Sequence, residues 1–286
     1  MSLTFWSNTI WFILLFVTSV ISVILILYKT NNVKFTIAFL FSILGFTFLL
    51  EVILVISLRA YSYHPKIVSD LFLDNVFGNY FSQISISSTS LLIAVYNPPY
   101  IWYSIFALIY YLIEELFVKL GIYEHFWYKS IYTLFGFIPF FWLIKKWYAK
   151  VKDSMDNVMN YISLFLSIFA INSLTIILSQ RLLGIQIFKG NLFADISKDH
   201  TTTGLVYQFF EINLLMILYR SKLHWIMKAM ALISLFIVQY FLYIGGSIYI
   251  SKGLFLIVTT LDLLGCYSWI AVFNYLLSKQ TTTSQK

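Results

Sequence analysis

The sequence alternates between long apolar segments and short polar connections along its whole length. Each apolar segment approaches or exceeds the ~18–20 residues with which an α-helix crosses about 30 Å of hydrocarbon. Nine spanning helices are predicted, at residues 5–28, 35–58, 79–97, 100–121, 130–148, 157–180, 204–220, 223–248 and 253–278. We therefore predict an all-α fold, a polytopic helical bundle that forms one transmembrane domain over residues 1–278, followed by a polar C-terminal tail at 279–286.

The third predicted helix is the least apolar of the nine. It contains the run SQISISSTS, from Ser82 to Ser90. Small hydroxyl side chains let helices pack closely and can bond to the backbone. Pro98 and Pro99 end this helix, because proline cannot continue a helical hydrogen-bond ladder. We expect the third helix to be buried among the others.

Composition agrees with a membrane protein. Of 286 residues, 60% are hydrophobic and 11% are charged, whereas a soluble domain carries about 25% charged residues. The N-terminus has neither a basic residue before its apolar run nor a cleavage pattern after it, so we interpret it as the first helix and not as a signal peptide. The net charge is +7, but the basic residues are scattered through short loops, where they meet lipid headgroups. We expect membrane lipids, and no nucleic acid, as partners.

The basic residues also predict an orientation. With the N-terminus outside, the cytoplasmic segments hold 11 of the 19 Lys and Arg residues, including Lys145, Lys146, Lys150 and Lys152. Basic residues are favoured on the cytoplasmic side of a membrane. We therefore predict a plasma-membrane protein with its N-terminus outside and its C-terminus in the cytoplasm.

Two parts of the chain resemble each other weakly. The segment SDLFLDN resembles GNLFADI, and this alignment matches Asp74 with Asp195. The segment LIEELFVKLGIY aligns with IVQYFLYIGGSIY, and this alignment matches Glu114 with Gln239. The offset between aligned residues grows from 121 to 125. Transporter folds often contain internal repeats, so the pattern allows an N-terminal helix followed by two parallel four-helix units. These units would cover residues 35–148 and 157–278.

Cysteine and histidine suggest no metal centre. Cys266 is the one cysteine, which excludes a disulfide framework and a cysteine-based zinc site. The four histidines fall in loops or at helix ends without partners at metal-ligand spacing: His64, His125, His200 and His224. The sequence contains no phosphate-binding loop and no serine-nucleophile motif. We predict no cofactor and no metal.

The candidate chemistry lies in five acidic residues within the predicted helices: Glu51, Glu114, Glu115, Glu211 and Asp262. A carboxylate in hydrocarbon costs several kcal/mol, so such residues face the bundle interior, form pairs or stay protonated. Glu115 and Lys119 are four residues apart with the glutamate first, which predicts a structural ion pair on one helix face. Glu114 lies about 100° away around the helix and keeps no such partner.

Aromatic residues follow the glutamate pair, among them Tyr123, Trp127, Tyr128 and Tyr132. Rings with polar tips concentrate at the boundary between membrane and water, so an interfacial belt is the default interpretation. A cage of rings that binds a cation is the alternative.

The run from Ser90 to Val151 resembles an uncharacterised family of multi-pass membrane proteins from spore-forming Gram-positive bacteria. The matching residues are Glu114, Phe117, Val118, Lys119, Leu120, Gly121, Tyr123, Phe126, Trp127, Lys145 and Lys146, in about a fifth of the chain. The resemblance implies an integral membrane protein and supplies no activity. EELFVK is also similar to the Glu-Glu-x-x-x-Arg signature of CAAX-type intramembrane proteases, in which a glutamate acts as general base with histidines on later helices. Here lysine replaces the arginine, and the later histidines, His200 and His224, lie in loop-like positions or at a helix end.

The function that these residues favour is non-enzymatic binding or translocation of a small solute, ion or lipid. The candidate polar pocket or relay consists of Glu51, Glu114, Glu211 and Asp262. One alternative is a structural or signalling protein with a partner in the membrane, whose acidic residues only fix helix packing. The second alternative is a glutamate-dependent intramembrane protease.

Overall fold

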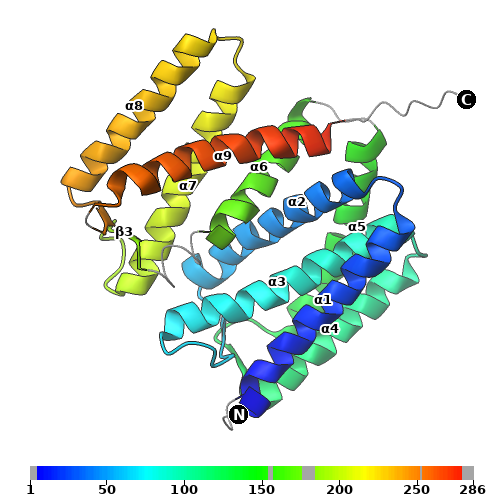
Figure 1. Ribbon diagram of the computed structural model, residues 1–286. Coiled ribbons are helices and arrows are strands. Elements are labelled where there is room, and N and C mark those ends of the chain that lie inside the picture. Colours follow the sequence, from blue (N-terminus) through cyan, green and yellow to red (C-terminus); the bar gives the residue numbers. More distant parts are fainter. Residues whose placement is uncertain (1–4, 154–156, 176–183, 252, 279–286) are drawn as a thin grey trace, which may run out of the picture. The chain divides into compact units, whose positions relative to one another are not determined.

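The computed structural model describes residues 5–153, 157–175, 184–251 and 253–278. Within them the chain forms nine α-helices (Figure 1): α1 (Ile10–Lys29), α2 (Val33–Glu51), α3 (Leu71–Tyr96), α4 (Ile101–Lys119), α5 (Ser130–Asp153), α6 (Asn157–Thr175), α7 (Ile196–Arg220), α8 (Trp225–Ile244) and α9 (Phe255–Leu277). Two π-helical segments, η1 (Phe5–Thr9) and η2 (Val52–Ser57), adjoin α1 and α2. The all-α prediction is confirmed. The predicted tail at 279–286 lies outside the described residues.

Seven of the described helices are long and apolar enough to cross a membrane. The two that do not meet this criterion are α3 and α5. The chain is therefore a multi-pass membrane protein, and its outer helix faces contact lipid.

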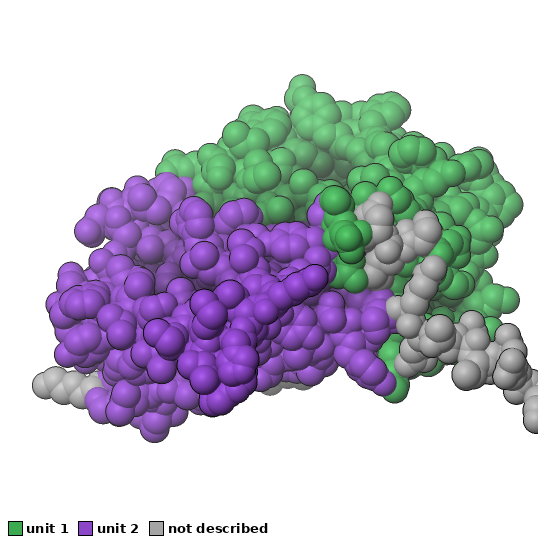
Figure 2. All heavy atoms as spheres, turned by 90° about the horizontal axis from the view of Figure 1, so that it is seen from above, with its two compact units in different colours: residues 1–160 green, residues 161–286 purple. Residues whose placement is uncertain are grey.

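The chain divides into two compact units, residues 1–160 and 161–286, which Figure 2 colours separately. Unit 1 contains the helices α1 to α5, and unit 2 contains α7 to α9 and nearly all of α6. Each unit is described by itself below.

Each unit also contains one pair of three-residue antiparallel strands. In unit 1, β1 (Tyr61–Tyr63) pairs with β2 (Tyr123–His125), with Tyr61 opposite His125. In unit 2, β3 (Gln186–Phe188) pairs with β4 (Ile248–Ile250) in the same register, with Gln186 opposite Ile250. The sequence does not predict these strands, because three residues are too few to show a two-residue periodicity.

The serine-rich helix α3 lies in the core of unit 1, where it packs against α1, α2 and α5. Four of its five serines are buried, and Ser88 and Ser90 donate to the carbonyl oxygens of Ser85 and Ile86 at 3.0 and 2.6 Å. A helix that neighbouring helices cover needs no lipid-facing apolar surface. The low hydropathy of α3 is therefore consistent with its burial.

Helices α3 and α7 each begin eight residues before their predicted starts at 79 and 204. The reason is a matching N-cap. Asp70 accepts a hydrogen bond from the amide of Leu73 at 2.8 Å, and Asp195 accepts one from the amide of Lys198 at 2.9 Å. An aspartate at this position stabilises the first turn of a helix by accepting from a free backbone amide. The first turn of α7, ISKD, is polar, whereas that of α3, LFLD, is mostly apolar.

A second aspartate, one turn inside each helix, binds the preceding loop. Asp74 accepts from three successive loop amides at 2.7–3.2 Å, and Asp199 accepts from four at 2.5–3.2 Å. Asp70 thus matches Asp195, and Asp74 matches Asp199. The sequence alignment of Asp74 with Asp195 was wrong by one helical turn, a shift that keeps the same helix face and therefore preserves the apolar pattern.

The structural correspondence has a constant offset. Tyr61 matches Gln186, and the left-handed residues Arg59, Lys66 and Gly121 match Gly184, Asn191 and Gly246, always 125 positions later. Glycine at 121 and 246 suits the positive φ that turns the chain from a helix into β2 or β4. Duplication as the origin of the two halves stays a prediction.

Candidate functional site

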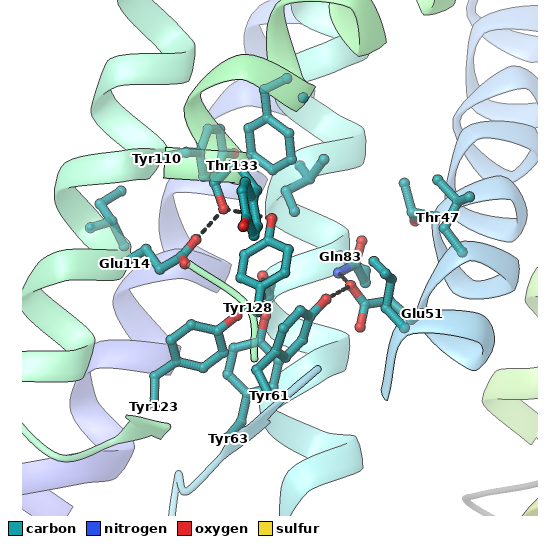
Figure 3. A pocket seen from close by; sticks show the side chains of 18 of the residues that line it. Thr47, Glu51, Tyr61, Tyr63, Gln83, Tyr110, Glu114, Tyr123, Tyr128 and Thr133 are labelled. Carbon is teal, nitrogen blue, oxygen red and sulfur yellow. Dashed lines mark hydrogen bonds between the residues drawn. The ribbon is translucent and has the colours of Figure 1, made fainter. Parts of the chain in front are cut away.

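A cavity of about 240 Å³ lies inside unit 1, between α2, α3, α4 and α5 and beside the β1–β2 pair. Figure 3 shows that Glu51 and Glu114 lie on opposite sides of a group of tyrosine side chains in this pocket. Pockets for drug-sized ligands measure roughly 300–1,000 Å³. The cavity therefore has the size of a site for a small solute.

Glu51 lies at the end of α2 and is 8% exposed. Tyr61 Oη and Gln83 Nε2 each donate to Glu51 Oε1 at 2.6 Å, and Asn79 Nδ2 donates to Oε2 at 2.8 Å. These donors come from β1 and α3, so Glu51 joins three elements. All three are neutral, so they satisfy the carboxyl oxygens without supplying a counter-charge.

Glu114 enters the cavity from α4, on the side opposite Glu51. His125 Nε2 lies 2.8 Å from Glu114 Oε1, and Thr133 Oγ1 donates to Oε2 in a short hydrogen bond. Tyr128 Oη in turn lies 3.0 Å from Thr133 Oγ1. The Glu114 and His125 side chains are 12% and 18% exposed. This carboxyl group is thus fixed by β2 and α5.

The sequence predicts His125 in a loop or at a helix end without a partner at metal-ligand spacing, and the structure adds a contact with Glu114 that the sequence does not predict. The chain leaves α4, turns at Gly121 with φ of 67°, and returns along β2. That return brings His125 back to Glu114, 11 residues earlier in the chain. A glycine that ends a helix shortly before a histidine is the only signal in the sequence, and by itself it does not specify the returning strand.

Tyrosines form much of the cavity wall: Tyr61, Tyr63, Tyr110, Tyr123, Tyr128 and Tyr132. The ring of Tyr61 contacts that of Tyr128 with centroids 5.1 Å apart, and the centroids of Tyr63 and Tyr123 are 4.6 Å apart. Tyr123, Tyr128 and Tyr132 line the cavity, whereas Trp127 is exposed. The interfacial belt and the cage that binds a cation both stay predictions.

Burial, followed by the negative charge of Glu51, raises the pKa of Tyr61 and Tyr63 well above the ordinary tyrosine value. Burial also raises the pKa of Tyr128 to about 12. These phenols therefore stay protonated at neutral pH. Their hydroxyl groups remain hydrogen-bond donors, and their rings remain uncharged.

The predicted pair Glu115 and Lys119 has a different environment. Both side chains are exposed, and neither residue takes part in the ion pairs of His64 with Glu124 and of His125 with Glu114. An exposed pair on a helix surface contributes about 0.3–0.5 kcal/mol, too little to fix one geometry. The structural pairing of Glu115 with Lys119 stays a prediction.

Glu211 and Asp262, the other two predicted site residues, come together in unit 2. Gln239 Nε2 on α8 lies 3.5 Å from Glu211 Oε1 on α7 and 3.3 Å from Asp262 Oδ2 on α9. The same nitrogen contacts Tyr207 Oη. The four predicted residues thus form two pairs, Glu51 with Glu114 in unit 1 and Glu211 with Asp262 in unit 2.

The described residues that line the cavity of unit 1 include two glutamates and no lysine, arginine or histidine. Across the described ranges, no three His, Cys, Asp or Glu side chains are grouped so that they could hold a metal ion. The arrangement favours a ligand that itself supplies positive charge. Comparison of the chain with protein families, with curated proteins and with solved structures gave no match in any of the three.

Proposed function

We propose that the protein binds a small organic cation in the cavity of unit 1, as a step in moving that cation across the membrane. The observation that carries the proposal is that Glu51 and Glu114 line one cavity together with six tyrosines, without a basic side chain among its described lining residues. An ammonium group supplies the counter-charge that the neutral donors around Glu51 do not.

The tyrosine rings add to this recognition. The face of an aromatic ring carries negative potential and attracts a cation, at about 0.5–1 kcal/mol for an exposed site and about 2 kcal/mol when water is excluded. A quaternary ammonium ligand uses several ring faces at once, as well as the field of both carboxyl groups. A neutral solute of the same shape gains only the dispersion contacts, and an anion is repelled.

The predicted orientation places this site toward the exterior. With the N-terminus outside and the C-terminus in the cytoplasm of a plasma-membrane protein, the chain emerges on the outer side after η2 and again after α4. Glu51 precedes η2, and Glu114 lies five residues before the end of α4. The cavity then lies in the outer half of the bundle, where a solute from outside reaches it first.

Uptake of radiolabelled choline into proteoliposomes tests this function. We expect accumulation with the wild-type protein and its loss with Glu51→Gln and Glu114→Gln. Glu115→Gln is the matched control, because Glu115 adjoins Glu114 but is exposed and is not among the described residues that line the cavity. Uptake that survives both cavity substitutions contradicts the proposal. If choline neither binds nor moves while both variants lose thermal stability, the acidic residues only fix helix packing, which is the role of a structural or signalling partner.

Glutamate-dependent hydrolysis is the second candidate, and the contact between His125 and Glu114 is the observation that favours it. A carboxylate held by a histidine beside a cavity is a candidate general base toward water. Since Glu115 is exposed, Glu114 alone would take this role. If one membrane protein accumulates in cells with Glu114→Gln and not with Glu115→Gln, hydrolysis is supported. An unchanged membrane proteome contradicts it.

A further inference from the structure

Unit 2 contains a small chamber at the place where unit 1 has its cavity. The chamber measures about 20 Å³. Its lining residues Phe188 and Gln208 lie 125 positions after Tyr63 and Gln83, which line the cavity of unit 1. The other described lining residues of the chamber also have counterparts 125 positions earlier in that cavity. The two pockets are therefore equivalent in position.

Six of the seven matched lining positions differ in residue type between the two pockets, and three of these exchanges introduce a large ring or an acid in unit 2. Where the cavity of unit 1 has Ser82, Ile86 and Phe137, the chamber of unit 2 has Tyr207, Glu211 and Asp262. The tyrosine replaces a small side chain and fills space, and two acids replace two apolar residues. The chamber by itself is too small for an organic solute, but its volume exceeds the ~10–15 Å³ that one water molecule needs. Asn172, Thr175 and Asp262 also line a neighbouring cavity of about 260 Å³ in unit 2.

The two acids of the chamber share one neutral partner. Glu211 Oε1 and Asp262 Oδ2 lie 3.5 and 3.3 Å from the same Gln239 nitrogen. Two ionised carboxylates that share a site repel each other, so such a pair retains a proton on one member. Among the described lining residues of the chamber, no lysine, arginine or histidine offsets a second negative charge.

Gln208 adds an independent observation. It is 1% exposed and lines the chamber, and its Nε2 has no hydrogen-bond partner. A buried donor without a partner costs about 1–3 kcal/mol, and a water molecule or an ionised carboxylate in the chamber removes that cost. A donor N–H is unfavourable beside a metal cation, so this group favours a proton site over a sodium site.

We propose that Glu211 and Asp262 form a proton-exchange site in unit 2, in which the pair shares one proton and a water molecule in the chamber bonds to Gln208. Protonation delivers an excess proton from solvent through that water molecule, which remains H₂O, to a carboxylate oxygen; release returns the proton to solvent by the same route, so that the pair alternates between one and two negative charges. The site goes beyond solute binding in unit 1, and neither depends on the other.

The surroundings of the pair contain two further titratable groups. Tyr207 on α7 and Cys266 on α9 both face the acids, whereas α8 contributes the amide of Gln239 and α6 that of Asn172. Asn172 donates to Cys266 Sγ at 3.4 Å. The phenol and the thiol are neutral acids, so the carboxyl pair is the group in this cluster that changes charge.

Infrared difference spectroscopy of the purified protein tests the site, since a protonated carboxyl group has its own C=O band. We expect the wild-type protein to show such a band that disappears as pH rises, and the double variant Glu211→Gln/Asp262→Asn to lack it. Each single variant should lose its band at a pH different from the wild type, because the remaining acid no longer faces a second carboxyl. Glu115→Gln is the control and should match the wild type.

Persistence of the titrating band in the double variant overturns the proposal, and so does an unchanged titration in both single variants. Gln208→Leu provides a second variant of similar size, in which the unpartnered donor is absent; we expect it to change the pH at which the band disappears. Titrations in sodium chloride and in choline chloride at equal ionic strength distinguish the bound ion. If the pH at which the band disappears differs between the two salts in the wild type but not in the double variant, the site binds sodium and the proton assignment is overturned.

Discussion

The hydroxyl group of Tyr61 donates a 2.6 Å hydrogen bond to Glu51, which links strand β1 to the end of helix α2 inside the cavity of unit 1. Tyr61→Phe removes one of three donors from a buried carboxyl group, so we expect a loss of about 1–3 kcal/mol in stability. Thermal unfolding in detergent measures this. Tyr132→Phe is the matched control, because Tyr132 also lines the cavity but is 46% exposed. Equal melting temperatures for the two variants would contradict the role of Tyr61.

The buried tyrosines predict a stability limit at alkaline pH. Burial raises the pKa of Tyr128 to about 12 and raises the pKa of Tyr61 and Tyr63 well above the ordinary tyrosine value. In the unfolded chain these phenols ionise near pH 10. Raised pKa values in the folded state therefore contribute stability that is complete below about pH 10 and declines as pH rises toward 12. Ultraviolet titration of phenolate should show a fraction of tyrosines that ionise only as the protein unfolds; complete ionisation near pH 10 in folded protein contradicts the burial.

Asp74 and Asp199 have the same role in the two units, so replacing either one should lower the stability of the protein by a similar amount. Each carboxylate accepts hydrogen bonds from several backbone amides of the loop before its helix. Asp74→Asn and Asp199→Asn each place an amide group there, and we expect each to lower stability by about 3 kcal/mol, since bonds to charged groups contribute about 1.5–3 kcal/mol. Glu124→Gln, at an exposed ion pair, should cost at most about 1 kcal/mol. The free energy of unfolding in detergent, measured for all three variants, tests this expectation. If neither aspartate variant is less stable than the wild type, the hydrogen bonds from the loops are refuted.

Replacement by alanine should have opposite effects on stability at two helical glycines. A Cβ atom at Gly78 on α3 would lie 2.4 Å from Tyr63 Cβ, whereas one at Gly136 on α5 would meet nothing within 4 Å. Gly78→Ala must push α3 away from β1, and we expect a loss of at least about 1–3 kcal/mol. Gly136→Ala should be neutral or stabilise by up to about 1 kcal/mol, because alanine favours helix. If Gly78→Ala melts at the same temperature as Gly136→Ala, or at a higher one, the close approach of α3 and β1 is disproved.

The helices follow from the sequence because burial in lipid demands long apolar segments, and those segments are visible without any structure. The early starts of α3 and α7 do not follow in the same way, since the helices extend beyond the apolar stretches to the caps Asp70 and Asp195. A local N-cap hydrogen bond, and not hydropathy, marks these boundaries.

The candidate site was predictable only in its acidic residues. Their cost in hydrocarbon marks Glu51 and Glu114 as residues that face inward. Their shared cavity depends on Tyr61 and His125, which the strands β1 and β2 bring to them. Three-residue strands leave no periodic signal in the sequence, so neither partner could be identified from it.

The central claim is that the cavity of unit 1 recognises positive charge. Isothermal titration of the purified protein with choline, and with its uncharged isostere in which carbon replaces the quaternary nitrogen, tests it most directly. We predict that choline binds at least about tenfold more tightly than the isostere, which corresponds to about 1.4 kcal/mol. The double variant Glu51→Gln/Glu114→Gln should abolish this preference, and Glu115→Gln should keep it. Equal affinity of the wild-type protein for choline and the isostere, or a preference for choline that survives in the double variant, would contradict the account.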